Sequence, residues 1–272
     1  MNHSTEEKND SPDSTVCQEV NQQSWNNETY LAWVNRFGTP QDAFVKIQKD
    51  PAKTISSLHH KFGEVEGKKI MNLMGSNGTK AVSLALLGAR VTVVDFSEGN
   101  KQYAMELAAQ AGTVIEYILS DILKLPREHI TGDYDIVFAE MGILHYFTDL
   151  KPFMDIVYKL LKKDGIFVIR DFHPVSTKLI SSRGTTAKIR KHKVTGDYFD
   201  TSLRESEVSY SKYLGGEEHT HKVLLRQWNL GEIITGIAGS GLVIQSLEEE
   251  PNRSCDTYDK GIPKTFIISA RK

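Results

Sequence analysis

Apolar and polar positions follow a regular pattern along much of the chain, typical of buried strands that alternate with amphipathic helices. The clearest case is residues 69–97. A short apolar run at 70–73 precedes small turn residues, then apolar positions at helical spacing, and then a second apolar run at 90–94. Unbroken apolar runs of this length are typical of parallel strands buried on both faces. The segment therefore predicts a β-α-β unit with Asp95 at the carboxyl end of its second strand.

The alternation continues beyond Asp95, with a helix expected over 100–111 and strands over 114–119, 134–139 and 166–170. An amphipathic helix before the last of these strands ends at Asp164 and Gly165, and another begins at Asn229. Two final apolar runs, 242–247 and 265–270, have no helix between them, which favours an antiparallel hairpin. The chain is thus predicted to be an α/β protein. We expect a doubly wound, mostly parallel seven-stranded sheet with a C-terminal antiparallel strand hairpin.

Three stretches depart from this pattern and divide the chain. Residues 1–24 are polar with few bulky apolar side chains, so they are expected to form a disordered tail. Residues 25–66 carry apolar residues at helical spacing and are expected to form an N-terminal helical extension. The rest, 67–272, is expected to be one domain with an inserted cap at 174–228. This polar cap, with short strands expected around 205–214 and 219–225, has too little apolar content for a core of its own.

Composition narrows the classes of partner. The 272 residues carry a formal net charge of -2, which gives no global basic footprint for nucleic acid or an anionic membrane. Cys17 and Cys255 cannot form a disulfide framework, no apolar run reaches the roughly 18 residues of a membrane span, and the polar N-terminus lacks the apolar core of a signal peptide. We expect a cytoplasmic protein with a small-molecule substrate and neither a nucleic-acid nor a membrane partner.

The first turn and the strand ends indicate an adenosine-bearing ligand. Small residues at 75–78 let a ligand approach the backbone, and Asp95 can accept hydrogen bonds from both hydroxyls of a ribose. The turn lacks the GxGxxG spacing typical of NAD-binding sheets. A second acidic residue, Asp121, follows the third predicted strand.

This combination resembles the class I S-adenosylmethionine-dependent methyltransferases, over about residues 65–173 by motif and 229–272 by topology. The opening motif of that family usually reads acidic-hydrophobic-Gly-x-Gly-x-Gly. Residues 72–78 read NLMGSNG, so Asn72 stands at the acidic position, and Met74 and Ser76 replace the first two glycines.

The resemblance implies S-adenosylmethionine as cofactor, with S-adenosylhomocysteine as product. It places Asp95 on the ribose, Phe96 and Ile122 on the adenine ring, and Asp121 on the adenine amino group. Glu140 matches the strand end that passes beneath the sulfonium. The aromatic residues Trp25, Tyr30 and Trp33 are candidates to close over the ligand. The expected cofactor-binding residues are Tyr30, Asn72, Met74, Gly75, Ser76, Asn77, Asp95, Phe96, Ser97, Asp121, Ile122 and Glu140.

Methyl transfer of this kind is an in-line displacement that depends mainly on proximity and orientation. A general base is needed only where the acceptor is protonated at the working pH. His145 and His173 are the candidate bases, since histidine titrates near neutrality. Each has an alternative structural role, in orienting a loop or a turn. The residues predict methyl transfer to a small molecule under the cap and leave an oxygen, nitrogen or carbon acceptor open.

Three alternatives stay open at this level. The basic run at 188–193 is the one feature in favour of an RNA or protein methyltransferase, and the departures in the opening motif favour a non-catalytic S-adenosylmethionine-binding regulatory protein. A metal site is a further alternative, because residues i and i+2 of an extended chain share a face. Its ligands would be Asp171, His173, His219 and His221.

Overall fold

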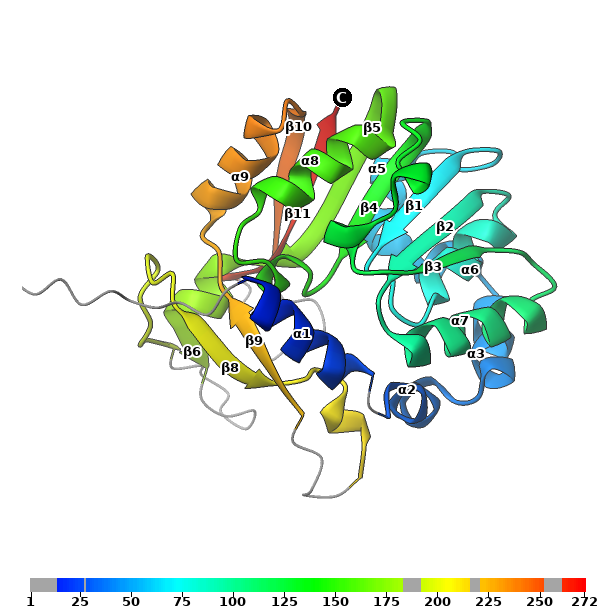
Figure 1. Cartoon of the computed structure of the whole chain (residues 1–272), viewed down its shortest axis with the longest axis horizontal. Coiled ribbons are helices and arrows are strands. Elements are labelled where there is room, and N and C mark those ends of the chain that lie inside the picture. The colour runs from blue at the N-terminus through cyan, green and yellow to red at the C-terminus, as the bar shows by residue number, and fades with distance from the viewer. Residues whose placement is uncertain (1–13, 27, 183–191, 216–220, 252–260) are drawn as a thin grey trace, which may run out of the picture.

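A seven-stranded sheet forms the centre of the molecule in the computed structural model, which describes residues 14–26, 28–182, 192–215, 221–251 and 261–272 (Figure 1). The strand order is β10-β11-β5-β4-β1-β2-β3. Neighbouring strands run parallel from β5 to β3, and β11 is antiparallel to both β5 and β10. This confirms the predicted fold. The strands are β1 (Lys69–Leu73), β2 (Arg90–Asp95), β3 (Glu116–Leu119), β4 (Tyr134–Glu140), β5 (Leu161–Phe172), β10 (Val243–Pro251) and β11 (Pro263–Arg271).

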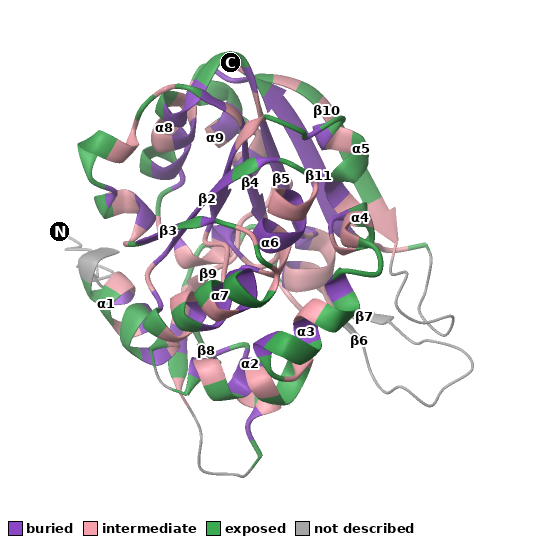
Figure 2. Cartoon of the chain, turned by 90° about the vertical axis from the view of Figure 1, so that its right-hand side faces the viewer, coloured by how far each residue is buried: buried purple, intermediate pink, exposed green. Residues whose placement is uncertain are grey.

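Helices cover both faces of the sheet, which explains the unbroken apolar runs. Successive strand residues enter different cores: Val93 and Phe138 pack in one, and Val94 and Val137 in the other, all of them fully buried. The helices α6 (Thr79–Leu86) and α7 (Glu98–Gln110) pack in the first core, and α8 (Lys151–Leu160) and α9 (Leu230–Gly239) in the second. Figure 2 shows the buried strands between these layers.

The expectation of a disordered tail over residues 1–24 is wrong for its second half. Residues 14–25 form helix α1 (Ser14–Trp25), whereas residues 1–13 lie outside the described part of the chain. Polar contacts hold α1 in place: Asn21 and Ser24 are buried, and both hydrogen-bond to the backbone of β9 (Lys222–Arg226). Cys17, expected in a floppy tail, is buried in the same helix.

Short helices follow α1 over most of the predicted extension. They are α2 (Thr29–Phe37), α3 (Pro40–Ile47), α4 (Pro51–Thr54) and α5 (Ser56–Phe62). Thr39 caps α3 in a reciprocal capping box with Asp42, and Pro40 begins the helix. Buried side chains, among them Ala32, Ile47 and Leu58, join these helices to the core beneath α6 and α7.

The cap region contains two small antiparallel pairs. One is β6 (Ile180–Ser182) with β7 (His192–Val194), and the other is β8 (Leu203–Glu207) with β9. After β8 the chain forms a 3-10 turn, η5 (Ser211–Tyr213), rather than the longer strand expected to reach residue 214. Val208, Tyr210 and Val223 are buried in the same core as α6. Residues 188–191 of the basic run lie outside the described ranges, as do His219 and Cys255.

Two predicted element ends also move. Helix α8 stops at Leu160, and β5 begins at once at Leu161, so the Asp164-Gly165 pair lies within the ordered start of that strand. Within the described ranges, no helix combines the length and the apolar character needed to cross a membrane.

Candidate functional site

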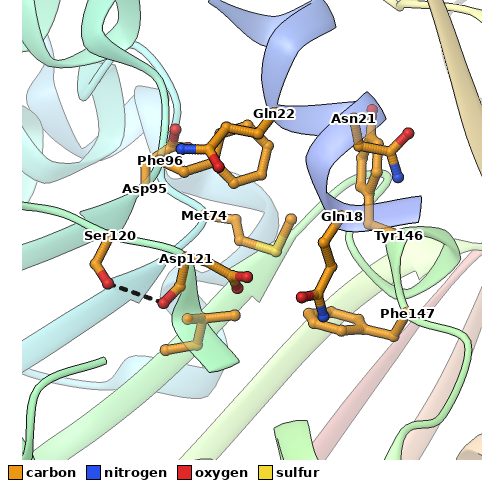
Figure 3. Close-up of a pocket in the computed structure, with 11 residues that line it drawn as sticks. Gln18, Asn21, Gln22, Met74, Asp95, Phe96, Ser120, Asp121, Tyr146 and Phe147 are labelled. Atoms are coloured by element: carbon orange, nitrogen blue, oxygen red, sulfur yellow. Dashed lines mark hydrogen bonds between the residues drawn. The ribbon is translucent and has the colours of Figure 1, made fainter. Parts of the chain in front are cut away.

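Asp95 and Asp121 lie in one narrow pocket at the carboxyl ends of the parallel strands, where doubly wound sheets bind their ligands. Met74 from the first turn lies between them, and its side chain points into the pocket (Figure 3). Phe96 and Ile122 add apolar surface. The two acidic residues therefore share a crevice, as an adenosine site requires.

The Asp95 carboxylate is held in a fixed orientation. Oδ2 accepts a hydrogen bond from the backbone N–H of Ser76 at 3.0 Å. Oδ1 accepts from the Ser97 N–H at 2.9 Å and from the Asn100 side-chain amide at 3.1 Å. Burial raises the pKa of Asp95, and these three hydrogen bonds oppose the rise. An oriented carboxylate with remaining lone pairs can accept hydrogen bonds from ribose hydroxyls.

The opening turn has left-handed backbone conformations of the kind that favour glycine, although Met74 and Ser76 are not glycines. Met74 and Ser76 have left-handed conformations, with φ of 48° and 53°, and Gly78 has φ of 71°. At Gly75 a Cβ atom would stand 2.6 Å from Asn72 Oδ1 and 2.7 Å from Val93 Cγ1. Only glycine fits there without displacing these neighbours. The turn thus forms a close backbone cradle above β1.

Two predicted cofactor residues have other roles. The Tyr30 hydroxyl donates to Glu106 on α7 at 2.5 Å, and this contact and burial raise the pKa of Tyr30 to about 12. Ser97 is fully buried, caps α7 through Asn100 N and donates to the Trp25 carbonyl. Neither side chain lines the crevice. An N-cap role for Ser97 is readable from the sequence, because Ser preceding a helix commonly accepts from its first turn.

Helix α1 supplies a wall of this pocket that the sequence analysis missed. Gln18, Asn21 and Gln22 line it, and Figure 3 shows Gln18 and Asn21 across the pocket from Asp95 and Asp121. Their amides add donors and acceptors beside the apolar surfaces of Phe96 and Ile122. The open volume in this part of the crevice is 20 Å³.

A larger chamber of 540 Å³ adjoins this pocket and shares Met74, Asp95, Phe96 and Tyr146 with it. Of the expected cofactor residues, Asn72, Gly75, Ser76, Asn77 and Glu140 line the chamber. The remaining walls come from α2, the end of β4 and the turn around η5. The crevice therefore has a narrow part and a wide part, joined at the opening turn.

Glu140 is charged and paired at the floor of the chamber. Its oxygens lie 2.7 Å from Lys80 Nζ and 3.2 Å from Arg170, and Ser57 donates to it at 2.8 Å. Burial alone raises the pKa of Glu140, but Lys80, Ser57 and Arg170 outweigh it and bring the pKa below its ordinary value. With its charge engaged by two cations, Glu140 is poorly placed to remove a proton from a substrate.

The two candidate bases differ in position. His145 lines the chamber beside Tyr146, with ring centroids 4.5 Å apart, and burial lowers its pKa below 6.5 against the opposing charge of Asp171. His173 is 2% exposed and lies outside the walls of the chamber. Its Nδ1 accepts from Val175 N, and its Nε2 contacts Glu249 at 2.7 Å. Both ring nitrogens of His173 therefore have partners within the protein, one in the turn after β5 and one on β10.

The residues of the metal alternative do not converge within the described ranges. Asp171 accepts hydrogen bonds from the backbone N–H groups of Gly142, Ile143 and Leu144, so it holds the turn after β4. No group of three or more metal-ligating side chains occurs among the described residues, and His219 lies outside them.

Comparisons with known proteins agree with this geometry. Residues 74–169 match a family model described as a methyltransferase domain. The ubiquinone biosynthesis O-methyltransferase of Bordetella pertussis is 23% identical over 195 residues, which cover 71% of this chain and 80% of that protein.

Solved structures share the fold at low identity. An S-adenosylmethionine-dependent methyltransferase from Mesorhizobium loti aligns with a TM-score of 0.60 at 23% identity, over 80% of this chain and 96% of its own. Magnesium protoporphyrin IX methyltransferase from Synechocystis PCC 6803, solved with bound SAH, aligns with a TM-score of 0.56 at 15% identity, over 94% of this chain and 99% of its own. Residues 74–169 are therefore similar to a methyltransferase domain, and the chain has the fold of the S-adenosylmethionine-dependent methyltransferases, as its sequence predicts.

Proposed function

We propose that the chain binds S-adenosylmethionine across the crevice and transfers its methyl group to a small-molecule acceptor in the wide chamber. The observation that carries the proposal is the shared pocket of Asp95 and Asp121, at opposite sides of Met74. Asp95 would hold the ribose, and Asp121 the adenine amino group. The methionine end would lie along the backbone cradle at Gly75, whose missing Cβ lets the Asn72 and Val93 side chains pack closely against the turn.

When bound, the cofactor supplies a methyl carbon activated by a positively charged sulfur. The protein then has to hold the acceptor in line with that carbon and keep water away. The aromatic side chains of the chamber, Trp25, Phe37 and Tyr213 among them, exclude water from the reacting atoms. His145 is the residue placed to accept a proton from a hydroxyl or ammonium acceptor, because it is the chamber's histidine and its pKa favours the neutral ring.

The direct test is calorimetric titration of the protein with S-adenosylmethionine and S-adenosylhomocysteine. Asp95→Ala serves as the site variant, and Asp133→Ala, at an exposed ion pair with Lys69, as the matched control. We expect binding by the parent and by the control and a strong loss in Asp95→Ala. Absence of binding by the parent protein would refute the proposal.

A homocysteine-release assay with a panel of small hydroxyl, amine and carbon acceptors then tests turnover. Transfer to one acceptor class, lost in His145→Ala, supports the enzyme. Cofactor binding without turnover on any acceptor would favour the non-catalytic alternative.

A further inference from the structure

The wide chamber has an aromatic wall whose rings are fixed in place. Trp33 lies 6.5 Å from Trp25, 5.8 Å from Phe37 and 6.0 Å from Tyr213, measured between ring centroids. The indole N–H of Trp33 donates to Asn100 at 2.6 Å, and that of Trp25 donates to the Tyr146 hydroxyl at 2.9 Å. With their polar atoms bonded inside the protein, these indoles offer a ligand mainly apolar ring surface.

Two cations lie next to this wall: Lys212 in η5, which lines the chamber, and Arg36 on α2, which packs against η5 but does not line the chamber. Lys212 Nζ lies 5.1 Å from the centroid of the Tyr213 ring, and the Arg36 guanidinium lies 5.0 Å from the same centroid. Both are exposed, and their contacts among the described residues are with aromatic rings rather than with carboxylates. The third nearby cation, Lys80, is already paired with Glu140 at 2.7 Å. Positive charge that a bound anion can neutralise therefore lies next to the wall.

We propose that the methyl acceptor is a small planar aromatic compound with an anionic substituent. Its ring would pack against Trp33, Phe37 and Tyr213, and its anion would face Lys212 and Arg36. Aromatic rings prefer offset or edge contacts with each other, as the tilted arrangement of this wall allows. This inference rests on the proposed methyl transfer, which requires the acceptor atom to face the methyl group of the cofactor.

Three probes test the aromatic ring and the anionic group of the proposed acceptor separately. 4-Hydroxybenzoate is aromatic and anionic, its methyl ester is aromatic and neutral, and 4-hydroxycyclohexanecarboxylate is anionic without an aromatic ring. Binding of each is measured by calorimetry in the presence of saturating S-adenosylhomocysteine. We expect 4-hydroxybenzoate to bind about fivefold more tightly than either of the others, since partly exposed charge pairs contribute modestly.

The double variant Arg36→Met with Lys212→Met should abolish the preference for the acid over its ester while leaving affinity for the ester unchanged. Phe37→Leu should weaken both aromatic probes and leave the alicyclic acid unaffected. Lys222→Met is the matched control, because Lys222 is an exposed lysine of the cap, paired with Glu205 and outside the chamber.

Equal affinity for all three probes, no binding of any of them, or a preference for the acid that survives in the double variant would overturn the acceptor assignment. Binding of S-adenosylhomocysteine is measured separately in every variant. If the parent protein does not bind S-adenosylhomocysteine, the proposed function is contradicted. If it binds S-adenosylhomocysteine but the three probes do not behave as expected, only the acceptor class is contradicted.

Discussion

Replacing Asp95 by Asn tests whether one carboxylate holds both the opening turn and the nucleoside. The substitution keeps the size of the side chain and removes one acceptor atom. In the parent protein, the two oxygens of Asp95 accept hydrogen bonds from three N–H groups, those of Ser76, Ser97 and Asn100, at 2.9–3.1 Å. An asparagine amide must turn its own N–H₂ toward at least one of these donors.

The least costly arrangement keeps the amide oxygen on Ser97 and Asn100, so only the Ser76 N–H loses its acceptor. A fully buried donor left unsatisfied costs about 1–3 kcal/mol, and the Ser76 N–H, which is part-buried at the chamber wall, should cost less. Part of this cost is offset, because burial raises the pKa of Asp95 and the neutral amide avoids the desolvation of a charge. We therefore expect the free energy of unfolding to fall by at most about 2 kcal/mol. A ribose hydroxyl would lose a charge-assisted hydrogen bond, which raises the Kd for cofactor about tenfold to a hundredfold.

The assay is calorimetric titration with S-adenosylhomocysteine at pH 7.5, with thermal unfolding of the same samples as the folding control. Asp133→Asn is the matched control, because it removes an exposed carboxylate paired with Lys69 far from the crevice. A Kd for Asp95→Asn within twofold of the parent, in a folded protein, would refute the reasoning.

Three further substitutions probe the opening turn, the candidate base and helix α1. Gly75→Ala should abolish cofactor binding, since its Cβ would stand 2.6 Å from Asn72 Oδ1, whereas Gly215→Ala, with no neighbour within 4 Å, should bind as the parent does; equal titrations would contradict this. Burial lowers the pKa of His145 below 6.5, so the rate should rise with pH as the ring becomes neutral in that range. His145→Ala should lower kcat about a hundredfold and remove this rise. An unchanged pH–rate profile would exclude His145 as the base. Asn21→Ala removes two hydrogen bonds between α1 and β9, so amide hydrogen exchange over α1 should become faster while the core stays protected. Unchanged exchange would show that these two hydrogen bonds do not hold α1 in place.

The sheet could be predicted because its signal is local. The central strands β1, β2 and β4 are mostly buried, so their runs are largely apolar, and an acidic residue stands at or just after the end of a strand. Asp95 closes β2, and Asp121 follows β3, so both reach the same edge of the sheet. Parallel topology alone brings these side chains together, which is why their shared pocket could be anticipated without any side-chain geometry.

Helix α1 could not be predicted from apolar content, since it docks largely through polar groups. Its buried positions Cys17, Asn21 and Ser24 recur at helical spacing, but two of the three are polar and read as solvated. Their partners are backbone atoms of β9, about 200 residues further along the chain. A contact of that range leaves no signal in the local pattern. The same limit explains Tyr30, whose hydroxyl donates to Glu106 and whose side chain does not line the crevice.

The opening turn shows that a backbone shape can persist without its usual residues. A left-handed conformation costs an L-residue about 1–2 kcal/mol, and both Met74 and Ser76 adopt it. Such strain persists only where the surroundings determine the conformation. Here the Ser76 N–H is held by Asp95, and its carbonyl accepts from the Tyr117 hydroxyl at 2.9 Å. The same carboxylate that is proposed to bind the ribose thus also stabilises the strained cradle, so loss of the nucleoside site and loosening of the turn should occur together.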